Sequence, residues 1–328
     1  MKQLSFLLFF TIFFSSIGQN HPGKVKWYTI DEATKLQKEN PKPIFVDIYT
    51  DWCGWCKKLD ATTFNDDNIS SYLNNYYYPV KLDAESADTM MYYGEAFVHP
   101  TGTKRTRTYH PLAQKLLGGK SAFPTMTFIT PDQKIMPVSS YMDAKKIQPL
   151  LVWVAEQASD FTPYAEFSDA FNKYFYKEDT VPYVDVNWLS LKQAQELQKT
   201  KPKKILLFLE ADWVFSARMM NRTFGQKEVA DYLNETYYCV KINATEKNDI
   251  EGFGQVWKNE SEQTSIHPLV AALSDNKLKF PGLIWLNEEG KLINRVQSYV
   301  DPVLFQKMLT FFGSNDYLTI QWKDYQAQ

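Results

Sequence analysis

The sequence has very little cysteine: only Cys53, Cys56 and Cys239 among 328 residues. Three thiols cannot build the disulfide framework that holds a small secreted fold together. Histidine is also scarce, with four residues, and there is no second Cys-X-X-Cys motif or nearby His pair to complete a zinc site. The pair Cys53 and Cys56 is therefore predicted to serve chemistry. A zinc half-site or an inert disulfide clip is the structural alternative.

An excess of charge of one sign is missing as well. The 36 Lys and Arg residues nearly balance the 38 Asp and Glu residues, which leaves a net charge of −2. This balance gives no reason to expect nucleic acid or an anionic membrane surface as a partner. The composition, 44% hydrophobic and 23% charged, is that of a globular protein, although 22 Phe, 20 Tyr and 9 Trp make it rich in aromatics. The length predicts about two domains.

The sequence also lacks a hydrophobic run of the roughly 20 apolar residues that are needed to span a bilayer. The apolar segment at residues 4–14 follows Lys2 and leads into the small residues at 15–18. This pattern predicts a signal peptide over residues 1–18, removed before Gln19. No cysteine follows the apolar segment, so a lipid anchor is not expected. We expect an exported protein, periplasmic or secreted.

The cysteine pair lies where a predicted strand passes into a predicted helix. Residues 44–49 are rich in β-forming side chains, and residues 57–61 favour a helix. Free backbone N–H groups and the helix dipole stabilise a thiolate at a helix N-terminus. A cysteine pKa of about 8.5 can fall there to roughly 3.5–7.5. Cys53 is therefore the predicted exposed nucleophile, and Cys56, one turn deeper, is the predicted resolving thiol.

A strand, then Trp-Cys-Gly-Trp-Cys-Lys, then a helix resembles the thioredoxin superfamily. Residues 46–59 are most similar to its exported members related to the C-terminal domain of the membrane thiol-disulfide interchange reductase. The resemblance implies that Asp47, six residues before Cys53, is a buried acid that helps to deprotonate Cys56. It also implies that Phe123-Pro124 forms a cis-proline loop, which faces the cysteines and receives the substrate backbone.

The other predicted substrate contacts are Trp52, Gly54 and Trp55. Either tryptophan could lie in the core or on the rim of the site, and Trp55, between the cysteines, is the better candidate for substrate contact. Asp47 could be a surface acid on an edge strand, but its apolar neighbours favour a buried position. Lys57, after Cys56, is expected to be solvated, and its presence in place of histidine excludes haem attachment.

The chain contains the same unit twice. The repeated segments are Val25-Lys26-Trp27 and Val186-Asn187-Trp188, Val80-Lys81-Leu82 and Val240-Lys241-Ile242, His110-Pro111-Leu112 and His267-Pro268-Leu269, and Phe123-Pro124 and Phe280-Pro281. We therefore predict an α/β fold of two tandem thioredoxin-like domains, each a central mixed sheet flanked by helices. The first is placed at residues 19–176 and the second at 177–328, because residues 177–182 break the pattern.

The second copy has lost the reactive groups. Val214-Phe215-Ser216-Ala217 replaces Cys53-Gly54-Trp55-Cys56, and Phe208 replaces Asp47. A buried acid is costly and is worth keeping mainly where a proton must be moved, so these losses are consistent with one another. Phe280-Pro281 persists, either as a peptide-receiving surface or as a loop that the fold requires. Cys239 is expected to be a buried, inert thiol.

Each half also carries an insertion before its Phe-Pro pair. In the first half, residues 94–98 and 105–109 could form a hairpin, followed by a short helix over residues 111–117. The cluster Lys104, Arg105 and Arg107 is expected to face solvent. The repeated His110 and His267 are expected to be turn or cap residues.

The predicted function is that of an exported thiol-disulfide oxidoreductase that reduces or exchanges protein disulfides through Cys53 and Cys56. The resemblance favours reduction but leaves the direction open. Expected partners are exported proteins with disulfides or free thiols and a separate membrane or periplasmic electron donor or acceptor; no cofactor and no metal are expected. The alternative is a non-catalytic, chaperone-like binding module in which the second domain holds partner proteins.

Overall fold

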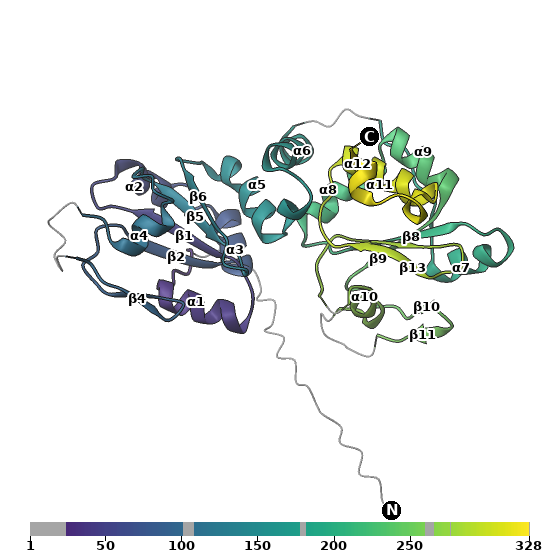
Figure 1. The fold of residues 1–328 in the computed structure, drawn as a ribbon, viewed down its shortest axis with the longest axis horizontal. Helices are drawn as coiled ribbons and strands as arrows, with labels where there is room; N and C mark the ends of the chain where they lie inside the picture. Colours follow the sequence, from purple (N-terminus) through teal and green to yellow (C-terminus); the bar gives the residue numbers. More distant parts are fainter. Residues whose placement is uncertain (1–23, 101–107, 178–181, 260–265, 276, 328) are drawn as a thin grey trace, which may run out of the picture. The chain divides into compact units, whose positions relative to one another are not determined.

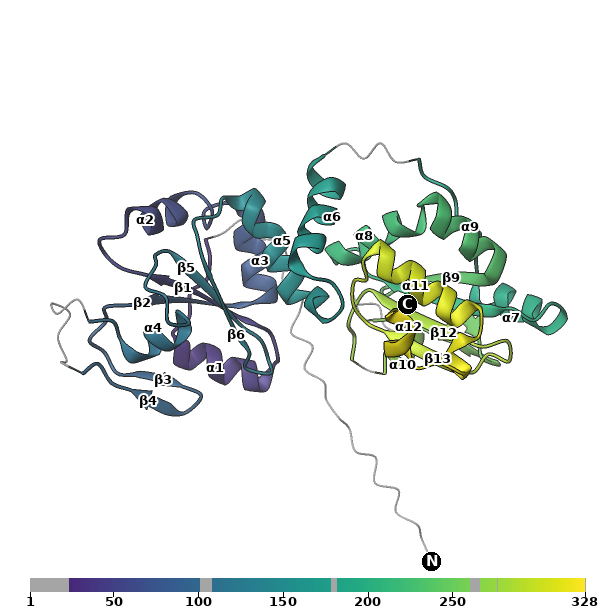
Figure 2. The ribbon, with the colours of Figure 1, turned by 45° about the horizontal axis from the view of Figure 1, so that its top comes forward.

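The computed structural model describes residues 24–100, 108–177, 182–259, 266–275 and 277–327. Its contacts divide the chain into two compact units, Met1–Ala144 and Lys145–Gln328 (Figures 1 and 2). The predicted signal peptide, residues 1–18, lies outside the described residues. The domain boundary predicted after residue 176 follows the sequence repeat, whereas the compact units divide earlier, and that boundary stays a prediction.

The first unit is built on a four-stranded mixed sheet in the order β2-β1-β5-β6. Its strands are β1 (Ile44–Tyr49), β2 (Tyr78–Asp83), β5 (Thr125–Ile129) and β6 (Ile135–Ser139). Strand β1 pairs parallel with β2 and antiparallel with β5, and β5 pairs antiparallel with β6. Because β1 is an inner strand, the residues that follow it lie at the carboxyl end of β1, away from the edge strands of the sheet.

Helices cover both faces of this sheet (Figures 1 and 2). The helices α1 (Ile30–Glu39) and α4 (Pro111–Leu116) lie on one face, and α2 (Gly54–Ala61) and α3 (Asp67–Tyr76) lie on the other. A core of buried apolar side chains joins α1 and α4 to the sheet. The fold is thus the mixed, helix-flanked sheet expected from the sequence.

Side chains of β1 alternate between the two faces, as in any strand. Ile44, Val46 and Ile48 belong to the apolar core that includes α1 and α4. Phe45 points the other way and packs edge-on against Phe64, which follows α2, at a ring distance of 5.7 Å. Asp47 has the same parity as Phe45, so it lies on the face covered by α2.

The insertion of the first half forms a hairpin at a different place from the one expected. Strands β3 (Met90–Tyr92) and β4 (Glu95–Phe97) pair antiparallel around Tyr93 and Gly94, both with positive φ. A two-residue turn with positive φ at both positions favours a tight hairpin. The expected pairing of residues 94–98 with 105–109 stays a prediction, because most of its second arm lies outside the described residues. Residues 101–107, with the basic cluster, lie outside the described part of the chain.

The second unit repeats this plan with a five-stranded sheet in the order β13-β12-β8-β9-β7. The central strand β8 again pairs parallel with its successor β9 and antiparallel with β12. The strands are β7 (Trp188–Leu189), β8 (Lys204–Glu210), β9 (Tyr237–Asn243), β12 (Gly282–Leu286) and β13 (Leu292–Val296), with a separate hairpin of β10 (Ile250–Gly252) and β11 (Gln255–Trp257).

Helices of the second unit begin before the second copy of the repeat and continue to the end of that copy. They are α5 (Ala144–Ala155), η2 (Ala158–Asp160), α6 (Tyr164–Tyr176), α7 (Leu191–Thr200), α8 (Phe215–Phe224), α9 (Lys227–Thr236), α10 (Pro268–Leu273), α11 (Pro302–Gly313), η3 (Asp316–Leu318) and α12 (Trp322–Gln326). Asp301 caps α11, with Pro302 at the first helical position.

The two copies share their helix caps as well as their strands. His110 is the N-cap of α4, and its Nδ1 accepts a hydrogen bond from the amide of Leu112 at 3.2 Å. His267 caps α10 in the same way, through the amide of Leu269 at 3.2 Å. Both rings are fully buried, and burial lowers the pKa of each. The expectation that they are cap residues is confirmed.

Replacing the His110 cap should destabilise the first unit by leaving a buried amide without its acceptor. We expect His110→Ala to lower the free energy of unfolding by about 1–3 kcal/mol. Since asparagine is a good N-cap acceptor, His110→Asn should recover part of this loss. Urea unfolding followed by circular dichroism measures both. Equal losses in the two variants would show that ring packing, and not the cap, is the source of the stability.

Candidate functional site

The cysteine pair is a disulfide at the start of α2, directly after the central strand. The two sulfur atoms are 2.04 Å apart. Cys53 is the N-cap of α2, and its Sγ accepts a hydrogen bond from the amide of Cys56 at 3.1 Å. The amide of Cys53 in turn donates to the carbonyl of Thr50 at 3.1 Å. The sulfur of Cys53 therefore occupies the position where backbone amides and the helix dipole favour an anion.

Little of either cysteine reaches solvent in the disulfide form. Cys53 is 5% exposed and Cys56 is 2% exposed. Cys53 is the more exposed of the two cysteines, which agrees with the predicted roles. It is nevertheless buried, so the expectation of an exposed Cys53 is wrong for this state. Gly54, between them in sequence, is exposed, and a side chain at this position would meet open space. Lys57 is exposed, as expected.

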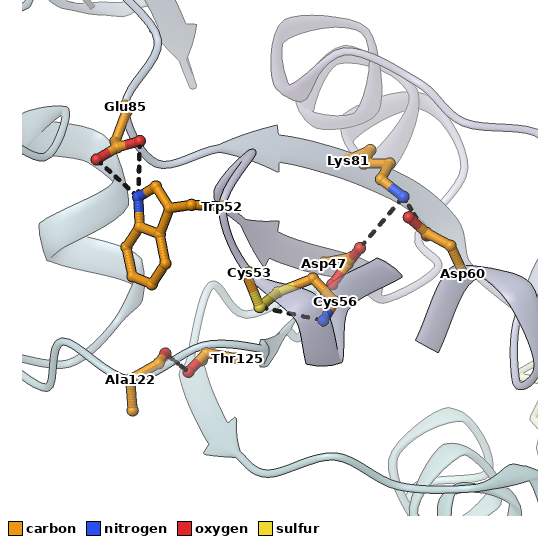
Figure 3. Close-up of a disulfide and its surroundings, with 9 residues drawn as sticks. All are labelled: Asp47, Trp52, Cys53, Cys56, Asp60, Lys81, Glu85, Ala122 and Thr125. Atoms are coloured by element: carbon orange, nitrogen blue, oxygen red, sulfur yellow. Dashed lines mark hydrogen bonds and ion pairs between the residues drawn. A yellow bond between two sulfur atoms is a disulfide. The ribbon is translucent and has the colours of Figure 1, made fainter. Parts of the chain in front are cut away.

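Asp47 is completely buried on β1, which confirms its predicted position. Within the described part of the chain, neither of its carboxylate oxygens has a hydrogen-bond partner. An ion pair links Oδ2 to the Nζ of Lys81 at 3.6 Å, which is beyond hydrogen-bonding distance (Figure 3). Burial raises the pKa of Asp47 to about 7, although the charge of Lys81 acts in the opposite direction. Asp47 can therefore exchange a proton near neutral pH.

Lys81 is shared between two carboxylates. It lies opposite Asp47 in the β1–β2 register, and it also forms a short ion pair with Asp60 of α2. Figure 3 shows Lys81 between these two acids. The negative charge of Asp60 contributes to the raised pKa of Asp47. Nothing in the sequence pattern pointed to Asp60 or Lys81 as members of the site, because their contacts depend on how α2 lies against the sheet.

Two exposed tryptophans form the rim of the site, with Trp52 62% and Trp55 55% exposed. The Nε1 of Trp52 donates to both carboxylate oxygens of Glu85 at 3.1 Å (Figure 3). The ring of Trp55 lies 5.2 Å from that of Tyr141, and the ammonium of Lys58 lies 4.9 Å above Trp55. The choice between core and rim is thus settled for both tryptophans. Their partners were not predicted.

The Phe123-Pro124 loop completes the site. Its peptide bond is cis, the geometry that the resemblance implies. The loop is held by a hydrogen bond from the hydroxyl of Thr125 to the carbonyl of Ala122 at 2.7 Å (Figure 3). The ring of Phe123 contacts Trp52 edge-on at 5.8 Å, so this loop and the rim form one continuous surface. The predicted roles of these residues toward a substrate remain predictions.

A family model of thioredoxin-like proteins matches most of the chain. The family is described as "Thioredox_DsbH: Protein of unknown function, DUF255", and its model matches residues 15–160 and again residues 167–308. The chain belongs to this family. The two successive matches confirm the tandem thioredoxin-like domains predicted from the repeat.

Curated relatives are distant and uncharacterised. The chain is 26% identical over 114 residues, or 34% of its length, to the uncharacterized protein B0495.5 of Caenorhabditis elegans. It is 34% identical over 58 residues, or 18% of its length, to an uncharacterized protein of Archaeoglobus fulgidus. These matches cover 13% and 46% of the two relatives, so the chain spans less than half of either one.

Solved structures with the same fold are also similar to parts of the chain. A thioredoxin-fold protein from Helicobacter pylori is 18% identical, with a TM-score of 0.33, over 47% of this chain and 94% of that one. The oxidised C-terminal domain of DsbD from Neisseria meningitidis is 21% identical, with a TM-score of 0.25, over 39% of this chain and 96% of that one.

The second thioredoxin-like domain carries no dithiol at the matching position. Phe208 is fully buried on β8, where the first domain has Asp47. Val214 is the N-cap of α8, where the first domain has Cys53. The Phe280-Pro281 bond is cis, as in the first domain. Cys239 is buried, and burial raises the pKa of its thiol to about 12, which agrees with an unreactive cysteine.

Metal-ligand groups and membrane-spanning helices were the other features of interest in the part of the chain that the structure describes. Among those residues, no group of three or more His, Cys, Asp or Glu side chains could hold a metal ion. Over the same residues, no helix combines the length and apolar character needed to cross a bilayer. The dithiol therefore remains the candidate site.

The raised pKa of Asp47 predicts how stability depends on pH. The folded protein binds this proton more tightly than the unfolded chain, so its stability should fall as pH rises from about 4 through about 7. Asp47→Asn removes the buried charge. We expect it to stabilise the oxidised protein at pH 8.5 by on the order of 3 kcal/mol and to have little effect at pH 4.

Urea unfolding of the oxidised protein at the two pH values, followed by tryptophan fluorescence, measures this difference. Glu95→Gln is the matched control, because it removes an exposed acid from the same unit. An equal increase in the free energy of unfolding from Asp47→Asn at both pH values would contradict a raised pKa for Asp47.

Proposed function

We propose that this chain is an exported thiol-disulfide oxidoreductase that acts on protein disulfides through Cys53 and Cys56. The observation that carries the proposal is the position of the disulfide. It combines a helix N-terminus, a cis-proline loop and a buried acid with a pKa near 7. Membership of the thioredoxin-like family supports the same chemistry. Export rests on the signal peptide predicted over residues 1–18.

In the reducing direction, the Cys53 thiolate attacks one sulfur of a substrate disulfide. A bond forms between Cys53 and that sulfur, and the second substrate sulfur leaves as a thiolate and takes up a proton. Cys56 then loses its proton to the carboxylate of Asp47 and attacks the sulfur of Cys53. The Cys53–Cys56 disulfide forms, and the first substrate sulfur leaves as a thiolate. Two electrons have passed to the substrate.

The disulfide form is thus the product of substrate reduction. Turnover needs a separate electron donor, which we place at the membrane or in the periplasm. Substrates are exported proteins with disulfides, or with free thiols if the pair runs in the oxidising direction. The exposed rings of Trp52 and Trp55 suit an extended polypeptide because they offer apolar surface, and Trp52 contacts Phe123 of the cis-proline loop.

The nucleophile is tested with insulin reduction in the presence of dithiothreitol. We expect Cys53→Ser to reduce the rate to that of dithiothreitol alone, because the attacking sulfur is gone. Cys239→Ser is the matched control, since it removes a buried thiol of the second domain and should leave the rate unchanged. Wild-type activity in Cys53→Ser would rule out the mechanism.

The resolving step is tested by trapping. Cys56→Ser leaves Cys53 able to attack and unable to be released, so mixed disulfides with exported proteins should accumulate and disappear on reduction. Non-reducing gels of cell extracts detect them. When both cysteines are present, the attack of Cys56 on Cys53 releases the substrate. Asp47→Asn should slow this release several-fold at pH 7. Traps that also form in a Cys53→Ser, Cys56→Ser double variant would contradict the assignment.

A further inference from the structure

The helix α8 in the second domain corresponds to α2 but begins in a different way. Its N-cap is Val214, whose side chain accepts no hydrogen bond. The first amides of a helix have no partner within the helix and need an acceptor from elsewhere. In the first domain the sulfur of Cys53 is an acceptor at this end, bound by the amide of Cys56.

A carboxylate from another part of the chain fills this position in the second domain. Glu156 follows α5, and its two oxygens accept hydrogen bonds from the amides of Phe215 at 3.0 Å and Ser216 at 2.8 Å. The hydroxyl of Ser216, which is fully buried, also donates to Glu156. Amides and dipole at a helix N-terminus stabilise a negative charge, so Glu156 is a matched ligand for this helix end.

The residue after Glu156 is bound on the same side of the domain. The backbone carbonyl of Gln157 accepts a hydrogen bond from the hydroxyl of Ser298 at 2.9 Å. Its side-chain oxygen accepts a short hydrogen bond from Lys279, which directly precedes the cis pair Phe280-Pro281. Gln157 therefore connects the cis-proline loop with the loop that follows β13.

Thr162 is held at the other end of this segment. Its hydroxyl oxygen accepts a hydrogen bond from the amide of Asp301 at 3.2 Å. Its carbonyl accepts another from the Nε1 of Trp153 at 2.8 Å. Thr162 is 1% exposed, and Ser298 is fully buried. Residues 156–162, which we call the docked segment, are thus fixed at both ends by partly buried hydrogen bonds.

The docked segment touches three parts of the second domain: the start of α8, the residue before Phe280-Pro281, and residues 298–301. The repeat matches them to the start of α2, the Phe123-Pro124 loop and residues 140–143. In the first domain these parts surround the disulfide, where Tyr141 contacts Trp55. A piece of the chain itself thus lies on the second domain where a substrate peptide would lie on the first.

We propose that the docked segment is the resident ligand of the second domain's former substrate site, anchored by Glu156, and that it closes this site to other peptides. Binding of partner proteins then falls to the first domain, which argues against the hypothesis of a second domain that holds partners. The statement that the docked segment occupies a former substrate site rests on the proposed function. The hydrogen bonds that hold the segment on the second domain do not depend on redox activity.

Hydrogen exchange of the full-length protein tests the anchor. Mass spectrometry of fragments covering residues 214–219 should show protection in the wild type and at least tenfold faster exchange in Glu156→Ala. Glu166→Ala, which removes an exposed acid from α6, is the matched control and should exchange like the wild type. Unchanged protection in Glu156→Ala would overturn the proposal. If that variant does not fold, Glu156→Gln, which keeps the shape of the side chain, is measured instead.

Closure is tested by adding the segment as a separate molecule. A fluorescein-labelled synthetic peptide of residues 154–164 should bind the full-length Glu156→Ala variant at least tenfold more tightly than the wild type, whose site is occupied. The same peptide with alanine in place of glutamate is the control and should bind neither. Equal binding to variant and wild type, or binding to neither, would overturn closure. Insulin reduction should be unchanged throughout, so a failure of closure is distinct from a failure of the proposed function.

Discussion

The hydrogen bond from the amide of Cys56 to the sulfur of Cys53, at the start of α2, is the interaction on which the candidate site depends. Strand β1 delivers the chain to the edge of the sheet, and the carbonyl of Thr50 holds the amide of Cys53 at the turn. The sulfur of Cys53 then accepts from the amide of Cys56. Because a helix N-terminus favours negative charge, the geometry that caps α2 suits the thiolate on which the proposed function depends.

A second constraint is the cost of the acid beneath this site. Asp47 is buried without a hydrogen-bond partner among the described residues, and the nearest cation, Lys81, is shared with Asp60. An isolated buried charge is expensive, and the raised pKa is the direct result. In the second domain Phe208 fills the position of Asp47 with an apolar ring. The buried acid at this position is thus found in the domain that has the Cys53–Cys56 pair and is absent from the matching position of the other.

The amides at the start of α2 and at the start of α8 have different hydrogen-bond acceptors. In α2 the acceptor is Cys53, within the cysteine motif itself. In α8 the acceptor is Glu156, which precedes the second copy of the repeat, and its two oxygens accept from the amides of Phe215 and Ser216. Glu156 and α8 belong to the same compact unit, which begins at Lys145. On the proposal made above, the surface of the second domain that corresponds to a substrate site is covered by the chain itself.

Local pattern alone determined much of this protein: the strand at residues 44–49, the cysteine pair at the start of a helix, the duplicated unit, and the caps at His110 and His267. These features depend on residues close in sequence, so spacing and residue type suffice to predict them. Tertiary structure decided the rest, because the contacts of Lys81 with Asp60, of Trp52 with Glu85 and of Glu156 with α8 join residues far apart in sequence. Only the packing of helix on sheet, and of one segment on another, brings such residues within reach of each other.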